Sequence, residues 1–408
     1  MVGAGLAGLT CARELRSEGW DVVVLEAGDG VGGRIRTERV DCFTVDRGFQ
    51  VLNTAYPALR GTVDLGRLDL RRLPRGVRIR RRGVLEDVPH PLAEPTAPWR
   101  ALGSGATDLH GKLALARYVG GLMLSSAEAV KRRPDVPAAV AWSEHLPASV
   151  VQDVLVPFMS GVVLEAEVST SRVFTDLMMR MFVRGTSAVP AAGMQALPEA
   201  LAARLPTSSL RLQSPVAEVG HDVVVLADGR TVAAFAVVVA TDATTAHRLL
   251  PELGPAPASR GVTTYYFAAD PWPGMSGVLT LDADRSGVVN SVVLTESAPE
   301  YSSDGRALVA TSVLHDGRGP ALTVEKAREV TGQLHGTSAD DLEVVACRDV
   351  PDALPAMTAP HPLRRPLREP GRRGVWVAGD HRDTSSIQGA IVSGRRAAQS
   401  VARALAQP

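Results

Sequence analysis

A glycine-rich turn near the start of the chain, with a helix, a strand and an acidic residue behind it, constrains the fold most. Gly3, Gly5 and Gly8 have the GxGxxG spacing, and the segment after them carries apolar residues at helical intervals. Residues 21–26 are then mostly apolar and end in Glu26. Glycine is needed where such a turn tightens, where its backbone approaches a pyrophosphate and where the helix packs on the strand. The pattern predicts an α/β protein that binds a dinucleotide at the helix N-terminus, where free N–H groups favour an anion.

The position of Glu26 supports this interpretation, because an acid about 20 residues beyond the turn can accept hydrogen bonds from ribose hydroxyls. The strand that should precede the turn is represented only by Met1 and Val2. In this kind of fold that strand lies in the middle of the sheet, so its loss would leave hydrogen bonds of the ladder unmade. We therefore expect the native chain to begin several residues upstream of Met1.

The charge balance and the cysteine count narrow the classes of protein. The 44 basic and 44 acidic residues give a net charge of zero, which argues against a protein built to coat nucleic acid. The three cysteines are far apart and the histidines form no HxxxH pair, so neither a disulfide framework nor a metal site is expected. No apolar run approaches the ~20 residues of a spanning helix, and no leader opens the chain. We expect a cytoplasmic protein, at most peripheral to a membrane.

A second glycine motif follows the acidic residue. Ala27 leads into Gly32, Gly33 and Arg34. Together with the first turn, this order resembles the flavin-containing amine oxidase and phytoene desaturase superfamily of FAD-dependent oxidoreductases. The resemblance implies that Arg34 contacts the diphosphate of FAD, and a guanidinium fork can bind two phosphate oxygens at once. The motif therefore favours FAD over NAD as the dinucleotide.

The next segment extends the resemblance. Residues 46–50 read Asp-Arg-Gly-Phe-Gln, and the Asp-x-Gly segment of the family runs beside the isoalloxazine ring of the flavin. Gly48 and Phe49 are therefore candidate neighbours of that ring. Ordinary core packing is the alternative for Phe49, because aromatic side chains are often buried.

The far end of the chain carries a matching motif. Residues 374–380 form an apolar strand that ends in Gly379 and Asp380, and Ser386 can cap the helix that follows. In the family, the Gly-Asp pair binds the diphosphate and the ribityl hydroxyls, and the helix start faces the flavin pyrimidine. The dipole of such a helix stabilises negative charge on a flavin that is being reduced.

A third piece of the pattern lies between these ends. Residues 215–219 and 236–240 read as strands, and residues 223–232 as a hairpin around Asp228-Gly229. In the family, a backbone contact at the position of Val216 holds the adenine. The resemblance thus implies one set of FAD contacts, formed by Gly3, Gly5, Ala7, Gly8, Glu26, Ala27, Gly32, Gly33, Arg34, Gly48, Phe49, Val216, Gly379, Asp380, Gln388 and Gly389.

Two blocks of the chain remain for binding substrate. Residues 67–187 look mostly helical, and residues 261–365 alternate like strands around one amphipathic helix at 324–334. The expected fold is α/β, with a Rossmann-like FAD-binding domain of the glutathione reductase type and a discontinuous α+β substrate domain. The expected boundaries are residues 1–66, 188–260 and 366–408 for the first domain and residues 67–187 and 261–365 for the second.

The resemblance covers two chemistries, and the lysines bear on the choice between them. In the family, amine oxidases usually hold a water at flavin N5 with a lysine from the sheet of the substrate domain. The lysines here are Lys112, Lys131 and Lys326, and all three fall on predicted helices. We therefore favour a dehydrogenase or desaturase that passes hydride from a C–H bond of an apolar substrate to flavin N5. Residues 178–182, rich in methionine, are candidate lining for an apolar tunnel, with plain core packing as the favoured alternative.

Two other hypotheses stay open. An amine or amino-acid oxidase is the first alternative, and a non-catalytic binder resembling GDP-dissociation inhibitors is the second. The intact Glu26, Arg34 and Gly379-Asp380 argue against the non-catalytic binder. The sequence identifies no catalytic acid or base and no oligomeric state.

Arginine-rich segments raise the hypothesis of a peripheral contact with a membrane. The segments contain Arg67, Arg71, Arg72, Arg75, Arg78, Arg80, Arg81 and Arg82, and then Arg364, Arg365, Arg368, Arg372 and Arg373. Such clusters can dock on an anionic membrane surface, at about 1 kcal/mol per contacting arginine. A solvated face is the favoured alternative, because the net charge is zero. We also expect His381 to be a solvated loop histidine, with a place near the flavin ring as the alternative.

Overall fold

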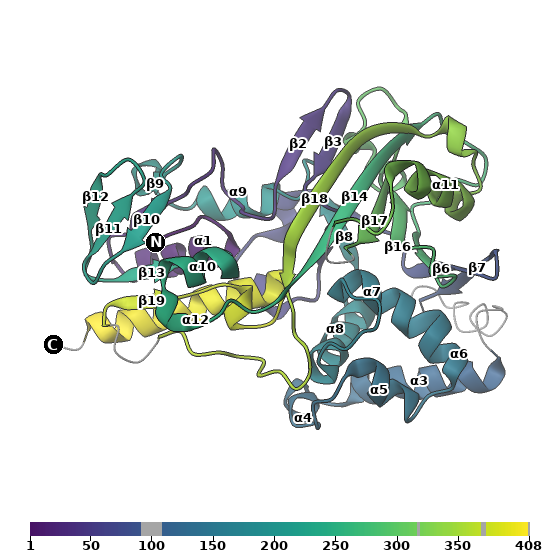
Figure 1. The fold of residues 1–408 in the computed structure, drawn as a ribbon, viewed down its shortest axis with the longest axis horizontal. Helices are drawn as coiled ribbons and strands as arrows, with labels where there is room; N and C mark the ends of the chain where they lie inside the picture. The colour runs from purple at the N-terminus through teal and green to yellow at the C-terminus, as the bar shows by residue number, and fades with distance from the viewer. Residues whose placement is uncertain (91–107, 316–318, 369–372, 407–408) are drawn as a thin grey trace.

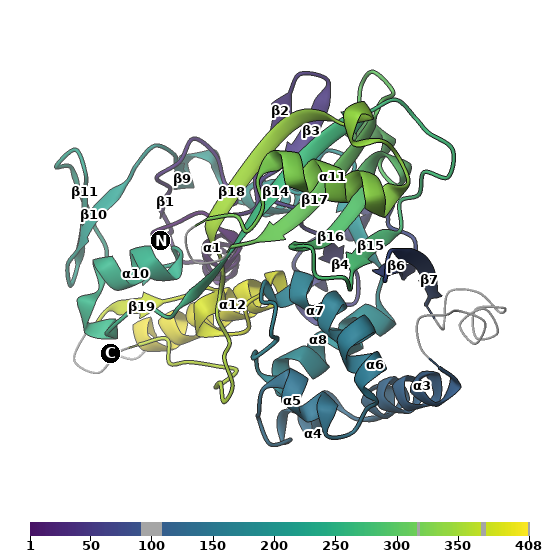
Figure 2. The same ribbon diagram turned by 45° about the vertical axis from the view of Figure 1, so that its right-hand side comes forward.

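The computed structural model describes residues 1–90, 108–315, 319–368 and 373–406 (Figure 1). It is a mixed α/β structure. A seven-stranded sheet lies on one side, and a layer of short parallel strands with two packed helices lies on the other. A group of helices lies next to the seven-stranded sheet (Figure 2). The expected α/β class is confirmed.

The N-terminal residues pair with strands from distant parts of the sequence. Val2 forms parallel bridges with both Leu25 and Val239. The parallel strand pairs of this layer are β1 (Val24–Leu25) with β9 (Leu210–Arg211), and β13 (Val237–Val239) with β19 (Val375–Val377). The strands predicted here are present, although β1 has only 2 residues. Because parallel strands end at one edge of a sheet, the residues that follow them meet at that edge.

Two helices from opposite ends of the chain pack against each other in this part of the molecule. They are α1 (Leu6–Ser17) and α12 (Ile387–Leu405), which lie side by side in Figure 1. Gly394 permits their close approach, because a Cβ atom at this residue would lie 2.3 Å from the carbonyl oxygen of Ala7. The first and last helices are thereby held together.

Smaller antiparallel sheets and two short helices surround this layer. These elements are β2 (Thr37–Val40), β3 (Phe43–Asp46), β4 (Leu52–Asn53), β5 (Leu70–Arg72), β8 (Ser187–Pro190), β10 (Val216–Val219), β11 (Val223–Leu226), β12 (Thr231–Ala233), α9 (Ala196–Ala202) and α10 (Ala243–Leu249). The hairpin predicted around Asp228 and Gly229 joins β11 to β12. Gly229 has a φ of +84°, which glycine adopts without strain.

The seven-stranded sheet has the strand order β18-β14-β17-β16-β15-β6-β7. Its strands are β6 (Gly76–Arg81), β7 (Val84–Pro89), β14 (Ser259–Ala269), β15 (Leu279–Asp282), β16 (Val288–Val293), β17 (Ala307–Leu314) and β18 (Glu343–Pro355). The helix α11 (Val324–His335) covers one face of the sheet (Figure 2). The strands and the helix predicted in this block are confirmed. β18 escapes prediction because charged residues recur along it and Pro351 interrupts it, which an edge strand tolerates.

The block predicted as mostly helical begins with strands instead. β5, β6 and β7 precede its first helix, and the turn between β6 and β7 falls at Arg82 and Gly83. In the middle of β6, Val77 and Ile79 alternate with arginines, a two-residue period that spans only a few residues. The helices of the block are α3 (Leu109–Leu124), α4 (Ala127–Lys131), α5 (Ala138–Ser143), α6 (Ala148–Val150), α7 (Val156–Val163) and α8 (Arg172–Arg184).

Most arginines of the first arginine-rich segment bind acidic side chains within the protein. Arg71 pairs with Glu300, and Arg80 pairs with Asp282 at 3.0 Å. Arg372 of the second segment lies outside the described residues. Across the described ranges, no helix has both the length and the apolar character that crossing a membrane requires. The ion pairs favour a solvated face, and contact with a membrane stays a prediction.

Replacing Gly394 by alanine tests the contact between α1 and α12. The added methyl group would meet the Ala7 carbonyl oxygen at 2.3 Å, so we expect the free energy of unfolding to fall. Overpacking of this kind costs about 1–3 kcal/mol. Gly121→Ala is the control, because Gly121 lies in α3 with nothing within 4 Å of its added Cβ. Alanine should stabilise α3 by up to ~1 kcal/mol.

Urea unfolding, followed by circular dichroism, measures the free energy of unfolding of the parent and of both alanine variants. A Gly394→Ala protein as stable as the parent would contradict the close contact of the two helices.

Candidate functional site

One large cavity, with a volume of 1260 Å³, extends from the glycine turn before α1 to the helices α3, α7 and α8. It gathers most of the predicted cofactor residues. These lining residues are Gly3, Gly5, Ala7, Glu26, Ala27, Gly32, Gly33, Arg34, Gly48, Phe49, Val216, Gly379 and Asp380. Gly8, Gln388 and Gly389 do not line it. A Cβ atom at Gly8 would lie 2.1 Å from the Gly3 carbonyl oxygen, so this glycine serves the packing of the turn on the helix.

The glycine turn and Glu26 form one wall of the cavity. Gly3 has a φ of +100°, and a Cβ atom there would lie 2.8 Å from the carbonyl oxygen of Ala240. The Glu26 carboxylate accepts hydrogen bonds from the backbone N–H groups of Ala4 at 2.7 Å and Gly28 at 2.9 Å. These bonds fix the carboxylate at the end of β1 and leave lone pairs that can accept bonds from hydroxyl groups.

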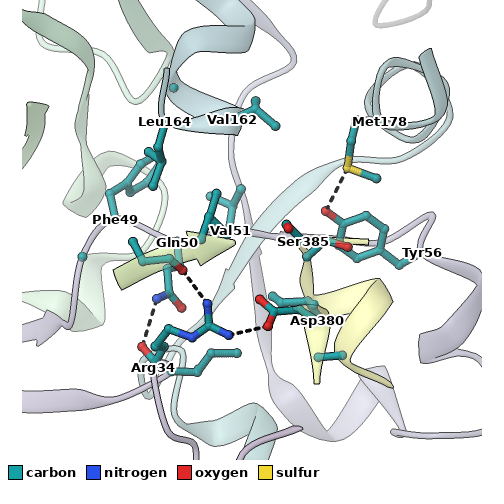
Figure 3. A pocket seen from close by; sticks show the side chains of 18 of the residues that line it. Arg34, Phe49, Gln50, Val51, Tyr56, Val162, Leu164, Met178, Asp380 and Ser385 are labelled. Carbon is teal, nitrogen blue, oxygen red and sulfur yellow. Dashed lines mark hydrogen bonds and ion pairs between the residues drawn. The ribbon is translucent and has the colours of Figure 1, made fainter. Parts of the chain in front are cut away.

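Arg34 and Asp380 form an ion pair across the cavity wall. They are 346 residues apart in the sequence, yet the guanidinium and the carboxylate lie 2.7 Å apart. Arg34 also donates to the Ala353 carbonyl oxygen, and Gln50 donates to the Arg34 carbonyl oxygen at 3.1 Å (Figure 3). The Asp380 side chain is only 5% exposed. Arg34 uses two of its N–H donors in these bonds, so further donors remain for a phosphate.

The first turn of α12 contributes to the same cavity. Ser386 caps the helix by accepting a hydrogen bond from the Gly389 N–H at 3.0 Å, and Ile387 lines the cavity. Gln388 instead holds the chain, because its Oε1 accepts a hydrogen bond from the Ala58 N–H at 2.8 Å. Contact of Gln388 and Gly389 with a cofactor stays a prediction.

The segment that follows β3 is held by a buried carboxyl group. Asp46 accepts hydrogen bonds from the hydroxyls of Thr37 and Tyr301, and burial raises the pKa of Asp46. Farther along, Phe49 donates its backbone N–H to the Thr264 hydroxyl at 3.1 Å. The Phe49 side chain then lies at the cavity wall, as Figure 3 shows.

His381 is buried, so the expectation of a solvated loop histidine is wrong. It is 3% exposed, and neither ring nitrogen has a hydrogen-bond partner among the described residues. Burial lowers the pKa of His381 to about 4, because a charged imidazole would lose its hydration. The ring packs tightly on Gly379, where a Cβ atom would lie 2.5 Å from it. This packing depends on contacts that the loop sequence does not reveal.

Beyond the cofactor motifs, the cavity wall is mostly apolar. Phe158 and Phe182 line it, with their ring centres 5.1 Å apart in an edge-on arrangement. Met178 and Met179 from α8 line it as well, whereas Met181 does not. The methionine-rich helix therefore does contribute to the cavity.

The lysines differ in their surroundings. Lys112, from α3, lines the cavity. Lys131 pairs with Glu128 and Lys326 with Glu329, each at 2.7 Å on the protein surface. The helical placement predicted for all three is confirmed.

Several polar residues of the cavity wall are absent from the sequence-based site, and among them are Thr241, Asp242, Asn290 and Ser312. Thr241 and Asp242 follow β13 at the edge where Glu26 follows β1. The rule that ligands bind at the carboxyl ends of parallel strands could have found them. Asn290 and Ser312 lie on β16 and β17, where no local signal in the sequence marks them.

Comparison with known proteins identifies the family. A sequence profile of flavin-containing amine oxidoreductases matches residues 6–402. The chain belongs to this family. It is therefore a flavin-dependent oxidoreductase, and the residues around the glycine turn are consistent with FAD as the flavin. Membership of this enzyme family argues against the second alternative, a non-catalytic binder resembling GDP-dissociation inhibitors.

The curated relatives match only parts of the chain and only parts of their own length. Protoporphyrinogen oxidase 2 of Arabidopsis thaliana is 26% identical over 165 residues, which are 40% of this chain and 31% of that protein. Matches to five curated relatives span from 6% to 50% of their lengths.

Two solved structures share the fold along nearly the whole chain. A structure from Exiguobacterium sp. 255-15, assigned as a protoporphyrinogen oxidase, has a TM-score of 0.72 at 18% identity and covers 98% of this chain and 97% of its own. Cyclohexylamine oxidase from Brevibacterium oxydans has a TM-score of 0.71 at 19% identity, over 99% of this chain and 98% of its own. At such identities the likeness shows the fold alone.

Removing the Arg34 guanidinium should weaken the binding of FAD. We expect Arg34→Ala to raise the Kd for FAD roughly 10- to 100-fold, because a hydrogen bond to a charged group contributes about 1.5–3 kcal/mol. Titration of the apoprotein with FAD, followed by flavin fluorescence, measures the Kd. Arg39→Ala is the control, since Arg39 is exposed on β2 and does not line the cavity. Equal affinities of Arg34→Ala and the parent would refute this role of Arg34.

Protonation of His381 should destabilise the protein in acid. Its pKa of about 4 in the folded protein lies below the ordinary value of 6.5, so the unfolded state binds more protons between these values. The neutral His381 ring therefore contributes at most about 3 kcal/mol to the free energy of unfolding. This contribution is fully present above pH ~6.5 and is lost as the pH falls toward ~4.

The His381→Asn variant should therefore show a flatter dependence of stability on pH than the parent. Urea unfolding at a series of pH values between these limits measures the slope. His145→Asn, at an exposed position, is the control and should keep the parental slope. A parental slope in His381→Asn would show that His381 does not titrate as proposed.

Proposed function

We propose that this oxidoreductase removes hydrogen from a bulky, mostly apolar substrate. The observation that carries the proposal is the cavity of 1260 Å³, which joins the residues expected around FAD to a chamber lined by apolar residues such as Phe158, Phe182 and Met178. Pockets for drug-sized ligands measure about 300–1,000 Å³, so this volume leaves room for a cofactor and a second large molecule. An apolar wall favours the transfer of an apolar molecule from water and disfavours that of an ion.

The finer description of the fold belongs to this proposal. The parallel strand pairs at the glycine turn support a Rossmann-like FAD-binding domain of the glutathione reductase type, built from residues 1–66, 188–260 and 366–408. The seven-stranded sheet and its helices, from residues 67–187 and 261–365, then form the substrate domain. Residues from both parts line the one cavity, so a substrate in the chamber can reach the cofactor.

The residues of the chain have separate tasks in this scheme. Bound FAD supplies a hydride acceptor at flavin N5. Glu26 and Arg34 hold the ribose and the diphosphate, and the N-terminus of α12 places positive potential beside the flavin. Phe158, Phe182 and Met178 exclude water from the cavity and orient the substrate toward the cofactor by packing against it.

Oxidation of an amine is the second candidate, since the family is named for it and a structural neighbour is a cyclohexylamine oxidase. Two features favour the apolar substrate. Among the described residues, no lysine lines the cavity from the sheet, and Lys112 comes from α3. The carboxylates of the described cavity wall are Glu26, Asp242 and Asp380, all beside the cofactor motifs. The chamber therefore offers an ammonium group no opposite charge from the described residues.

Anaerobic reduction of the bound flavin tests the two candidates. We expect apolar substrates of the carotenoid class to bleach the visible flavin absorbance, and primary amines to leave it unchanged. Bleaching by amines alone would overturn the proposal.

A charged side chain introduced into the chamber should slow the reaction with substrate and leave the binding of FAD unchanged. Val162 lines the cavity beside Leu164 (Figure 3). We expect Val162→Asp to slow flavin reduction by an apolar substrate at least about tenfold, because the substrate cannot compensate a buried carboxylate. The flavin content should match that of the parent, and Val162→Ala, which adds no charge, should react at nearly the parental rate. Stopped-flow absorbance measures the rate. A parental rate for Val162→Asp would place the substrate elsewhere.

A further inference from the structure

The face of the seven-stranded sheet that lines the cavity is apolar except at two neighbouring residues. The sheet residues of the cavity wall are Val350, Ala353 and Leu354 on β18, Val262 on β14, Ser312 on β17, Asn290 on β16, Leu279 on β15, Gly76 and Val77 on β6, and Val88 on β7. Only Asn290 and Ser312 among them carry polar side chains. Such a pair in an apolar wall is the kind of feature that orients a ligand in a pocket.

The register of the sheet places this pair close to the residues expected around the flavin. Asn290 is paired with Ser312 across β16 and β17, and Ser312 is paired with Thr264 across β17 and β14. Thr264 accepts the hydrogen bond of the Phe49 N–H. Since neighbouring strands are about 4.8 Å apart, Ser312 and Asn290 lie roughly 5 and 10 Å from Thr264 along the sheet.

Both side chains are buried, and one polar atom of Asn290 lacks a hydrogen-bond partner among the described residues. Asn290 is 6% exposed and Ser312 is 3% exposed. The Oδ1 atom of Asn290 has no hydrogen-bond partner among the described residues. An unpaired buried acceptor is costly, so this amide is incompletely satisfied where Asn290 borders the cavity.

A glycine of α7 holds the Asn290 amide in place. Gly161 also lines the cavity, and a Cβ atom at Gly161 would lie 2.4 Å from Nδ2 of Asn290. The helix backbone therefore packs directly on the amide and limits its rotamers. A side chain that is positioned before the ligand arrives loses little conformational entropy on binding.

We infer that Asn290 and Ser312 bind a neutral O–H or N–H group of the substrate. This inference rests on the proposed function and narrows it, since the substrate is then a mostly apolar molecule with one hydrogen-bonding group rather than a pure hydrocarbon. The Ser312 hydroxyl can donate or accept, and the amide offers both kinds of atom. A site built in this way rejects an analogue without the polar group, because the buried polar atoms would stay unpaired.

Binding of two matched probes tests the inference. The probes are retinol and the hydrocarbon that carries hydrogen in place of its hydroxyl group, added to the FAD-loaded protein. Perturbation of the visible flavin spectrum reports each Kd. We expect the parent protein to bind retinol at least about tenfold more tightly than the hydrocarbon.

Variants assign this preference to the two residues. Asn290→Leu, which keeps the size of the side chain, and Ser312→Ala should each bring the ratio of the two Kd values toward one. Val162→Ala is the matched control, because it trims an apolar residue of the cavity wall without touching the polar pair and should keep the parental ratio of the two Kd values. The flavin content of each variant reports whether it folds, and Ser312→Ala keeps the test valid if Asn290→Leu loses flavin.

The outcomes separate this inference from the proposed function. If the parent binds both probes equally, or if both variants keep the parental ratio, the polar pair is not the recognition site and the apolar chamber still stands. If neither probe binds the parent, the proposed apolar substrate fails, and the inference fails with it.

Discussion

A buried carboxyl group, that of Asp46, ties together the parts of the chain that meet at the cavity. It accepts hydrogen bonds from Thr37, Tyr301 and the Met194 N–H, while its carbonyl oxygen accepts one from the Tyr266 hydroxyl. Burial alone would make this charge costly, and the several donors offset that cost. Since residues directly after Asp46 line the cavity, its central wall depends on this set of bonds.

Close backbone approach is the second condition on which the site depends. The turn before α1, the end of β13 and the start of α12 come together only because glycine occupies the tightest positions. A Cβ atom at Gly3 would lie 2.8 Å from the Ala240 carbonyl oxygen, and one at Gly394 would lie 2.3 Å from that of Ala7. The same closeness lets Arg34 reach Asp380 from the other end of the chain. The cofactor wall is therefore assembled by long-range packing rather than by any one motif.

The sequence predicts the elements whose pattern is local. The helix after the glycine turn, the strands with apolar runs and the amphipathic α11 all show their own period, and the structure contains them. β18 is missed because charged residues and Pro351 occupy positions that a two-residue period would fill with apolar ones. The buried state of His381 and the place of Asn290 depend on contacts across the fold, which local periodicity does not encode. The cofactor residues were found through resemblance, and their joint lining of one cavity required the structure.

Substrate choice in this family cannot follow from the backbone alone. A protein assigned as a protoporphyrinogen oxidase and a cyclohexylamine oxidase superpose on this chain with TM-scores of 0.72 and 0.71, although their names give different substrates. The discrimination must lie in the side chains of the chamber, where a neutral polar pair and an apolar wall disfavour an ammonium ion by desolvation. Under the proposed function, the neutrality of Asn290 and Ser312 suits the chamber to a molecule that is apolar and still bears one hydrogen-bond donor.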